Sequence, residues 1–379
     1  MSQPVMPMPD PEALTRRRRR AVAAAQSAGC EALVAAGDTE FNKHGYVRYF
    51  TGWRLYGGTG FVVLRPAAEG IFVLGLGAQA EWAADACRGI EVRPVLDKIA
   101  AVAEAACAGT SSTARIAVAG LDAILSSGDA RRLQDAAGAR TLVDASALVE
   151  DQWATLEPDD IAAAEDAHAI VAEAFAAFRS ALAPGRTERE VVAAAYGRAA
   201  ELGCFAGIVN VSVSAGAGTH PATLRRFERG DVVKMFMEFL TPQGFLIELG
   251  GCFSFGEPNP VWRDRFSLAA HVIDAAIAAT RPGMVADDLV RFIAETMDQA
   301  GGRVVGRRLW DFHGQGYHSL QRPFGLPGSQ DPIREGMMIN IHPGLLTADG
   351  LGVSATNNYI VTPGGGRPLG GFRHVWQVV

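Results

Sequence analysis

Two similar phrases in the second half of the chain constrain its fold more than any other feature. Apolar residues recur at helical spacing over residues 161–182, the pattern stops at Pro184-Gly185, and a second helical pattern follows. The same order returns with a helix over 266–280, the joint Pro282-Gly283 and a helix over 287–300. Strand-like apolar runs follow each pair of helices. This repetition predicts an internally duplicated α+β domain.

The first part of the chain has a different pattern. Alanine-rich helical stretches alternate there with short apolar runs at residues 60–64, 71–74 and 116–119. Strands interleaved with helices predict an α/β domain. The polar segment Glu157-Pro158-Asp159-Asp160 then leads into the long helix, and its acidic residues suit a first helical turn. We therefore expect a smaller α/β domain over residues 1–152 and an α+β domain over residues 153–379.

Charge and composition exclude several classes of protein. A net charge of -6 and a pI near 5.8 give no broad positive surface for nucleic acid. No run of about 18 apolar residues is present to span a membrane, and the five cysteines are scattered without a Cys-x-x-Cys pair. The run Arg16–Arg20 leads into an alanine-rich segment, so we expect it on a solvated first helix. These features predict a cytoplasmic protein without nucleic-acid or membrane partners.

Several short motifs occur together in one order, and that order resembles a known family. The motifs are Ala183-Pro184-Gly185, Gly230-Asp231-Val232-Val233, Arg281-Pro282-Gly283, His313-Gly314-Gln315-Gly316 and Glu335-Gly336-Met337-Met338-Ile339. The set resembles the pita-bread family, which contains methionine aminopeptidase, aminopeptidase P, prolidase and creatinase. Tyr49-Phe50-Thr51-Gly52-Trp53 is similar to a turn in the leading domain of the creatinase and aminopeptidase P branch. The resemblance implies a pita-bread catalytic domain preceded by a creatinase-type α/β domain.

The residues that the resemblance assigns to metal binding are largely replaced. Metal-dependent members of the family hold two ions with two Asp, one His and two Glu. Carried over in order, these positions are Phe236, Glu248, His313, His342 and Thr356. Two hard divalent ions need several carboxylates to offset their charge and to bridge them. The sequence therefore argues against a dinuclear metallopeptidase.

One residue offers a partial replacement for the first acidic ligand. Glu238 lies two positions after Phe236, so the two side chains project from the same face of a strand. A shifted hairpin register would bring Glu238 into the ligand position.

The favoured hypothesis is a creatinase-like enzyme that works without metal. In creatinase a histidine shortly before the Gly-Asp phrase handles protons, and His220 occupies that place. A histidine suits this role because the side-chain type can both accept and return a proton near neutral pH. Glu248 would tune His220 or polarise the substrate, while His313 and His342 would hold a small substrate during cleavage or rearrangement at a carbon–nitrogen bond. The enzyme would be a hydrolase or a lyase with no cofactor, insensitive to chelators and inactivated by His220→Ala.

Two alternatives remain open. Glu248, His313 and His342 would form a mononuclear site for Fe(II), Zn(II) or Mn(II), since two histidines and one carboxylate suit these ions and leave positions for substrate or water. The second alternative is a catalytically silent pita-bread fold that serves as a binding module. The loss of metal ligands is what this hypothesis would predict.

Further side chains are expected to contact the substrate. They are Arg54, Tyr56, Phe236, His318 and Arg322. An arginine is suited to hold a substrate carboxylate with its forked guanidinium. In the creatinase branch the leading domain of one subunit lines the pocket of the other, which would give Arg54 and Tyr56 their role. The resemblance therefore implies a homodimer with twofold symmetry.

Overall fold

The chain forms two compact units. The computed structural model describes residues 7–66, 68–213, 216, 218–300, 311–342, 352–353 and 355–379. Contacts divide the chain into Met1–Trp153 and Ala154–Val379. This division falls one residue after the boundary expected from the sequence. Each unit contains a buried apolar cluster of its own.

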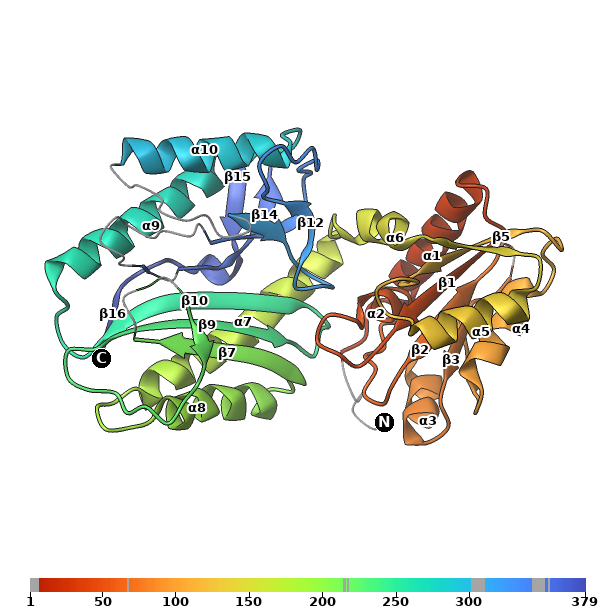
Figure 1. Cartoon of the computed structure of the whole chain (residues 1–379), viewed down its shortest axis with the longest axis horizontal. Coiled ribbons are helices and arrows are strands. Elements are labelled where there is room, and N and C mark those ends of the chain that lie inside the picture. The colour runs from red at the N-terminus through yellow and green to blue at the C-terminus, as the bar shows by residue number, and fades with distance from the viewer. Residues whose placement is uncertain are drawn as a thin grey trace. The chain divides into compact units, whose positions relative to one another are not determined.

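The first unit is built on one six-stranded mixed sheet with the strand order β4-β3-β2-β1-β5-β6 (Figure 1). Its strands are β1 Ala32–Gly37, β2 Gly60–Leu64, β3 Ile71–Leu74, β4 Glu91–Pro94, β5 Arg115–Ala119 and β6 Thr141–Asp144. Its helices are α1 Pro11–Ser27, α2 Gly45–Thr51, α3 Ala78–Ala86, α4 Lys98–Cys107, α5 Ser127–Ala137 and α6 Ser146–Trp153. The three predicted strands are β2, β3 and β5. Strands and helices alternate along most of the unit, so the α/β prediction is confirmed.

The arginine run lies on the first helix, as expected, but it is solvated only in part, because Arg16, Arg19 and Arg20 are exposed and the other two are not. The side chains of Arg17 and Arg18 are buried. The guanidinium of Arg17 lies 5.1 Å from the ring centroid of Tyr49, and Arg18 Nη1 donates to the carbonyl oxygen of Phe50 over 2.9 Å. These contacts join α1 to α2. Helical spacing turns neighbouring arginines toward different sides, so a charge run does not define one face.

Four helices of the second unit carry the predicted repetition. They are α7 Pro158–Ala181, α8 Glu188–Glu201, α9 Pro260–Ala279 and α10 Ala286–Gln299. Proline at the first position of α7 follows the Glu157 N-cap, as the acidic lead-in predicts. Thr187 and Glu190 cap α8 reciprocally. Among the described helices, none combines the length and the apolar character that crossing a membrane requires.

The second unit contains two five-stranded sheets, with strand orders β16-β10-β9-β7-β8 and β12-β11-β13-β14-β15. The first comprises β7 Ala206–Ser212, β8 His220–Pro221, β9 Val232–Leu240, β10 Leu246–Ser254 and β16 Gln377–Val378. The second comprises β11 Phe312–Gly314, β12 Gln321–Phe324, β13 Met338–Ile341, β14 Asn358–Thr362 and β15 Gly365–Pro368. Helices α7 and α8 pack against β10 and β7, and α9 packs against β13 and β15 (Figure 1). Each sheet therefore has a helix pair beside it.

Candidate metal centre

The hairpin of β9 and β10 places two glutamates opposite each other. An apolar run forms most of β9, and the chain turns at residues 241–245, where Gly244 takes a positive φ of 84°. The resulting register pairs Glu238 directly with Glu248. Cross-strand partners share one face of a sheet, so both carboxylates project from the same face. Both side chains are buried.

The same register places Phe236 two positions before Glu238 on β9. Phe236 pairs with Gly250 and lies on the same face as the glutamates. Glu238, and not Phe236, is therefore the residue of β9 that lies opposite Glu248.

Glu238 is held by two hydrogen-bond donors. Gln315 Nε2 donates to its Oε1 over 2.6 Å, and Ser319 Oγ donates to its Oε2 over 3.0 Å. Burial raises the pKa of Glu238 to about 7, although these two hydrogen bonds oppose the rise. This carboxyl group is therefore suited to accept and return a proton near neutral pH.

The raised pKa of Glu238 predicts that folding takes up a proton between pH 4.5, the ordinary value for the group, and pH 7. In that window the unfolded chain has lost the proton and the folded chain keeps it, so stability decreases as the pH rises. Relative to Glu238→Gln, the free energy of unfolding of the wild type should fall by up to roughly 3 kcal/mol. Urea unfolding of both proteins in excess chelator at pH 4.5, 6 and 8 measures the difference. A constant difference across these pH values would contradict the prediction.

The other sheet supplies a row of polar side chains. His313 on β11 pairs with Asn340 on β13, and Asn340 pairs with Asn358 on β14. The backbone N–H of Glu248 donates to Asn358 Oδ1 over 2.8 Å, which joins this row to β10. Side chains alternate along an extended segment, so a residue two positions from a member of this row falls on the same face. Such residues are Gln315, two after His313; His342, two after Asn340; and Thr356, two before Asn358.

Glu248, His313 and His342 converge on one point. Glu248 Oε2 lies 3.9 Å from His313 Nε2, and the two imidazole centroids are 5.0 Å apart. One ligand atom from each of the three residues lies within 4.8 Å of the other two. Glu248 and His313 are buried, and His342 is partly buried. The three residues that the sequence grouped as an alternative metal set therefore lie together.

His313 has the protonation state that a metal ligand needs. Its Nδ1–H donates to the carbonyl oxygen of Gly314 over 2.9 Å, so the Nε2 lone pair is left on the side of Glu248. Burial lowers the pKa of His313 to about 4, and the ring is neutral at physiological pH. Metal-binding histidines are commonly oriented in this way, with the second nitrogen bonded to a carbonyl or carboxylate.

The donor set fits one divalent ion better than two. One carboxylate and two imidazoles are a known set for a single ion with open positions. The polar side chains beside them are neutral and include Gln315, Asn340, Thr356 and Asn358. Across the hairpin from Glu248, Glu238 adds a further carboxylate. Two ions would need more negative charge than this.

His220 lies away from this group. It pairs with Val211, which in turn pairs with Met235, three positions before Glu238. Alternation along β9 therefore aligns His220 with the face opposite the carboxylates. Its side chain is exposed, and its Nδ1 lies 3.0 Å from the carbonyl oxygen of Pro221. The described structure does not bring His220 to Glu248, His313 or His342.

His318 and Arg322 come after the His-Gly-Gln-Gly motif in the sequence, and their side chains differ in burial. His318 is partly buried, and burial lowers its pKa to about 4. Its neighbour Ser319 contacts Glu238. Arg322 forms an ion pair with Asp331, and its side chain is 57% exposed. In this structure the guanidinium of Arg322, expected to bind a substrate carboxylate, therefore pairs with Asp331.

Arg54 and Tyr56 belong to the first unit. Both residues follow α2, and the backbone N–H of Tyr56 donates to Gln79 Oε1 over 2.8 Å. The Tyr56 ring lies between Trp53 and Trp82, with centroids 6.1 Å from each. Their expected role in a partner's pocket concerns an assembly of two chains, so it stays a prediction.

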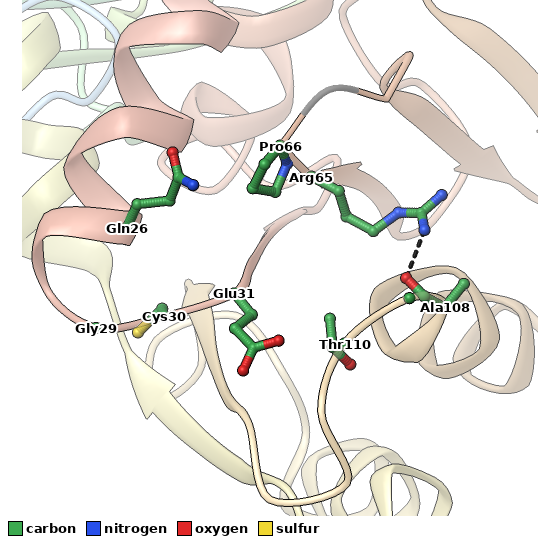
Figure 2. Close-up of a pocket in the computed structure, with 9 residues that line it drawn as sticks. Gln26, Gly29, Cys30, Glu31, Arg65, Pro66, Ala108 and Thr110 are labelled. Carbon is green, nitrogen blue, oxygen red and sulfur yellow. Dashed lines mark hydrogen bonds between the residues drawn. The ribbon is translucent and has the colours of Figure 1, made fainter.

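A separate cavity of about 530 Å³ lies within the first unit (Figure 2). Arg65 Nη1 donates to the carbonyl oxygen of Ala108 over 2.5 Å, and Glu31 and Thr110 also line the space. None of the residues expected to bind substrate or metal lines it. This cavity is therefore distinct from the group around His313.

Sequence reasoning missed three amides of the centre, Gln315, Asn340 and Asn358. Gln315 lies in a motif of which only the histidine was weighed, and Asn358 follows the last ligand position, Thr356, by two residues. Asn340 interrupts the apolar strand β13, and its side chain is fully buried. A polar residue inside an apolar strand is a detectable signal, because a buried amide needs hydrogen-bond partners.

Comparison with known proteins places these observations in a family. The sequence profile of Metallopeptidase family M24 matches residues 162–363. The probable dipeptidase PepE of Mycobacterium bovis is 26% identical over 231 residues, which cover 59% of this chain and 60% of the relative. The Xaa-Pro dipeptidase of Pyrococcus horikoshii is 23% identical over 255 residues, covering 66% and 72%. The match thus spans less than two thirds of the length of the PepE relatives.

Solved structures resemble the whole chain. Dipeptidase PepE from Mycobacterium ulcerans has a TM-score of 0.78 at 24% identity, covering 98% of this chain and 100% of that one. X-Pro aminopeptidase from Thermotoga maritima has a TM-score of 0.82 at 18% identity, covering 96% and 99%. At these identities the likeness concerns the fold. It confirms the predicted pita-bread domain with a preceding α/β domain.

Proposed function

We propose that this chain, which belongs to Metallopeptidase family M24, is a hydrolase with one divalent ion in its catalytic centre. The ion would be held by Glu248, His313 and His342. The substrate would be a small molecule with an amide or peptide bond, because relatives of the chain are named dipeptidases. The proposal favours the mononuclear alternative over the metal-free hypothesis. The proposed reaction is a hydrolysis, and the observations behind it do not support a lyase.

One observation carries the proposal, namely the convergence of three ligand atoms within 4.8 Å. Their residues come from β10, β11 and the end of β13, which are far apart in the sequence. Buried polar groups are retained in a fold when they have partners or a function. A silent binding module has no need for two imidazoles beside a buried carboxylate.

The chemistry of the site follows from its residues. A bound divalent ion would polarise a carbonyl oxygen or lower the pKa of a bound water. Glu238, opposite Glu248, has the pKa for moving a proton near neutral pH. Gln315 and Ser319 hold its carboxyl group in place through hydrogen bonds. We propose Glu238 as the proton-transfer group, in the role first assigned to His220.

We also propose a homodimer in which Arg54 and Tyr56 contact the substrate bound by the other subunit. The support is the resemblance of the Thr-Gly-Trp turn to the creatinase branch. Light scattering of the purified chain should give the mass of two chains, and the mass of one chain would reject the proposal.

Elemental analysis should find one divalent metal per chain, and its removal should abolish hydrolysis of a panel of dipeptides that includes Xaa-Pro peptides. One equivalent of a single metal should restore the activity, because three ligands hold one ion. Elemental analysis before and after dialysis against chelator, with activity assays at each stage, measures both effects. Full activity without metal, or two ions per chain at saturation, would reject the single-ion proposal.

A further inference from the structure

A buried cluster of amides lies beside the candidate metal ligands. Gln315 is its centre: Nε2 donates to Glu238, while Oε1 accepts from Asn340 Nδ2 over 3.2 Å and from Asn358 Nδ2. The side chains of Gln315, Asn340 and Asn358 have no exposed surface. We call these three residues the amide cluster. They fill the space between Glu238 and the strands of the other sheet.

One backbone group fixes the direction of every hydrogen bond in the amide cluster. The N–H of Glu248 can only donate, so the oxygen of Asn358 faces it and the Asn358 amide nitrogen faces Gln315. The oxygen of Gln315 therefore faces the two asparagines. Its nitrogen is left to donate to Glu238. The amides have a single consistent arrangement, which a rigid scaffold requires.

The amide cluster holds the backbone of Glu248 and lies beside its carboxylate. Asn358 accepts from the backbone N–H of Glu248. The Thr356 hydroxyl has one proton to donate, and both Asn340 Oδ1 and Glu248 Oε1, which is 3.0 Å away, are in place to accept it. Glu248 Oε2 is left on the side of His313. Gln315 thus influences the orientation of a metal ligand that it does not touch.

The amide cluster also explains why one ion would suffice. Its three side chains are uncharged and buried, so they do not balance the charge of a second cation. Hydrogen bonds through Gln315 and Asn358 link the carboxylate of Glu238 to the backbone N–H of Glu248.

We infer that the amide cluster takes the structural place of a second metal ion, and that Gln315 is the residue that positions Glu248 for the single ion. The inference rests on the proposed function for its metal. It deepens that proposal by assigning a positioning role to a residue outside the three ligands.

Gln315→Met tests the inference, because methionine has a similar length and lacks the amide. Titration of the full-length chain with Zn(II) should show affinity weakened about 10- to 100-fold, the range for residues that orient metal ligands. Gln26→Leu, an exposed change in the first unit, should bind as the wild type does. Thr356→Val, which removes the hydroxyl beside Glu248, should also weaken binding and serves as the second variant if Gln315→Met does not fold.

A metal-independent measurement separates this inference from the proposed function. In crystals of the metal-free variant, the distance of 3.9 Å between Glu248 Oε2 and His313 Nε2 should change by about 1 Å or more. An unchanged distance together with unchanged Zn(II) affinity would overturn the positioning role. Two ions bound by the wild type would overturn the replacement of the second ion. If the wild type binds no metal, the proposed function fails, and the distance in the variant still decides the role of Gln315.

Discussion

His313→Ala is expected to lower both metal affinity and kcat/KM at least about 100-fold. The substitution removes the Nε2 lone pair that lies beside Glu248 and the ring that lies next to His342. Two ligands cannot hold an ion as three do, and a small side chain leaves a polar void. The protein should stay folded, because His313 is not one of the residues that form the apolar core of its unit. Isothermal titration with Zn(II) and steady-state kinetics on the same preparation measure the two effects.

Two other histidines make this experiment decisive. His271 is exposed on α9, and His271→Ala should keep metal binding and activity at the wild-type level. His220→Ala should have little effect on metal affinity, because His220 aligns with the other face of its sheet. The metal-free hypothesis makes the opposite prediction. If His220→Ala abolished activity while His313→Ala and chelators spared it, the creatinase-like mechanism would replace the one proposed.

Gly314→Ala is expected to disrupt the catalytic unit more than any other single methyl group near the centre. A Cβ atom at this position would lie 2.2 Å from the carbonyl oxygen of Arg322 and 2.9 Å from that of Gln321. Both contacts are backbone atoms, so no side chain can rotate away, and β11 must move from β12. Overpacking of this kind costs about 1–3 kcal/mol or more, or roughly 2–12 °C in the unfolding midpoint. Activity should fall about 100-fold, because His313 and Gln315 flank the glycine.

Gly197→Ala is the matched control for this substitution. Gly197 lies within α8, and a Cβ atom there would meet no atom within 4 Å. Alanine is the better helix former by about 1 kcal/mol, so the midpoint should stay the same or rise while activity is unchanged. Calorimetry of the three proteins measures the midpoints. Equal midpoints for Gly314→Ala and Gly197→Ala would show that β11 and β12 separate without strain.

The elements of the fold were largely predictable from local pattern. Helical spacing with Pro-Gly joints identified α7, α9 and α10, and apolar runs identified three strands of the first unit. These signals are local, because a helix or strand buries a face of its own sequence. The solvation of Arg17 was not predictable in this way. Its burial depends on Tyr49, which lies on another helix.

The candidate centre was predictable only in part. Glu248, His313 and His342 were grouped through their order in the family, and the structure brings them together. The order of the motifs did not show which residue of β9 lies opposite Glu248, because motif order does not fix the register of a hairpin. The structure places Glu238 there, and a change of register would exchange the residues that meet.

By itself the sequence determined the family, the two-part organisation and the types of residue available for chemistry. These follow from motif order and periodicity, which are properties of neighbouring residues. Only the tertiary structure decided which carboxylates face each other, that His220 aligns with the opposite face, and that Gln315 joins Glu238 to Asn340 and Asn358. The physical reason is that these relations depend on strand register and on the pairing of distant strands. Both are settled by the packing of the whole unit.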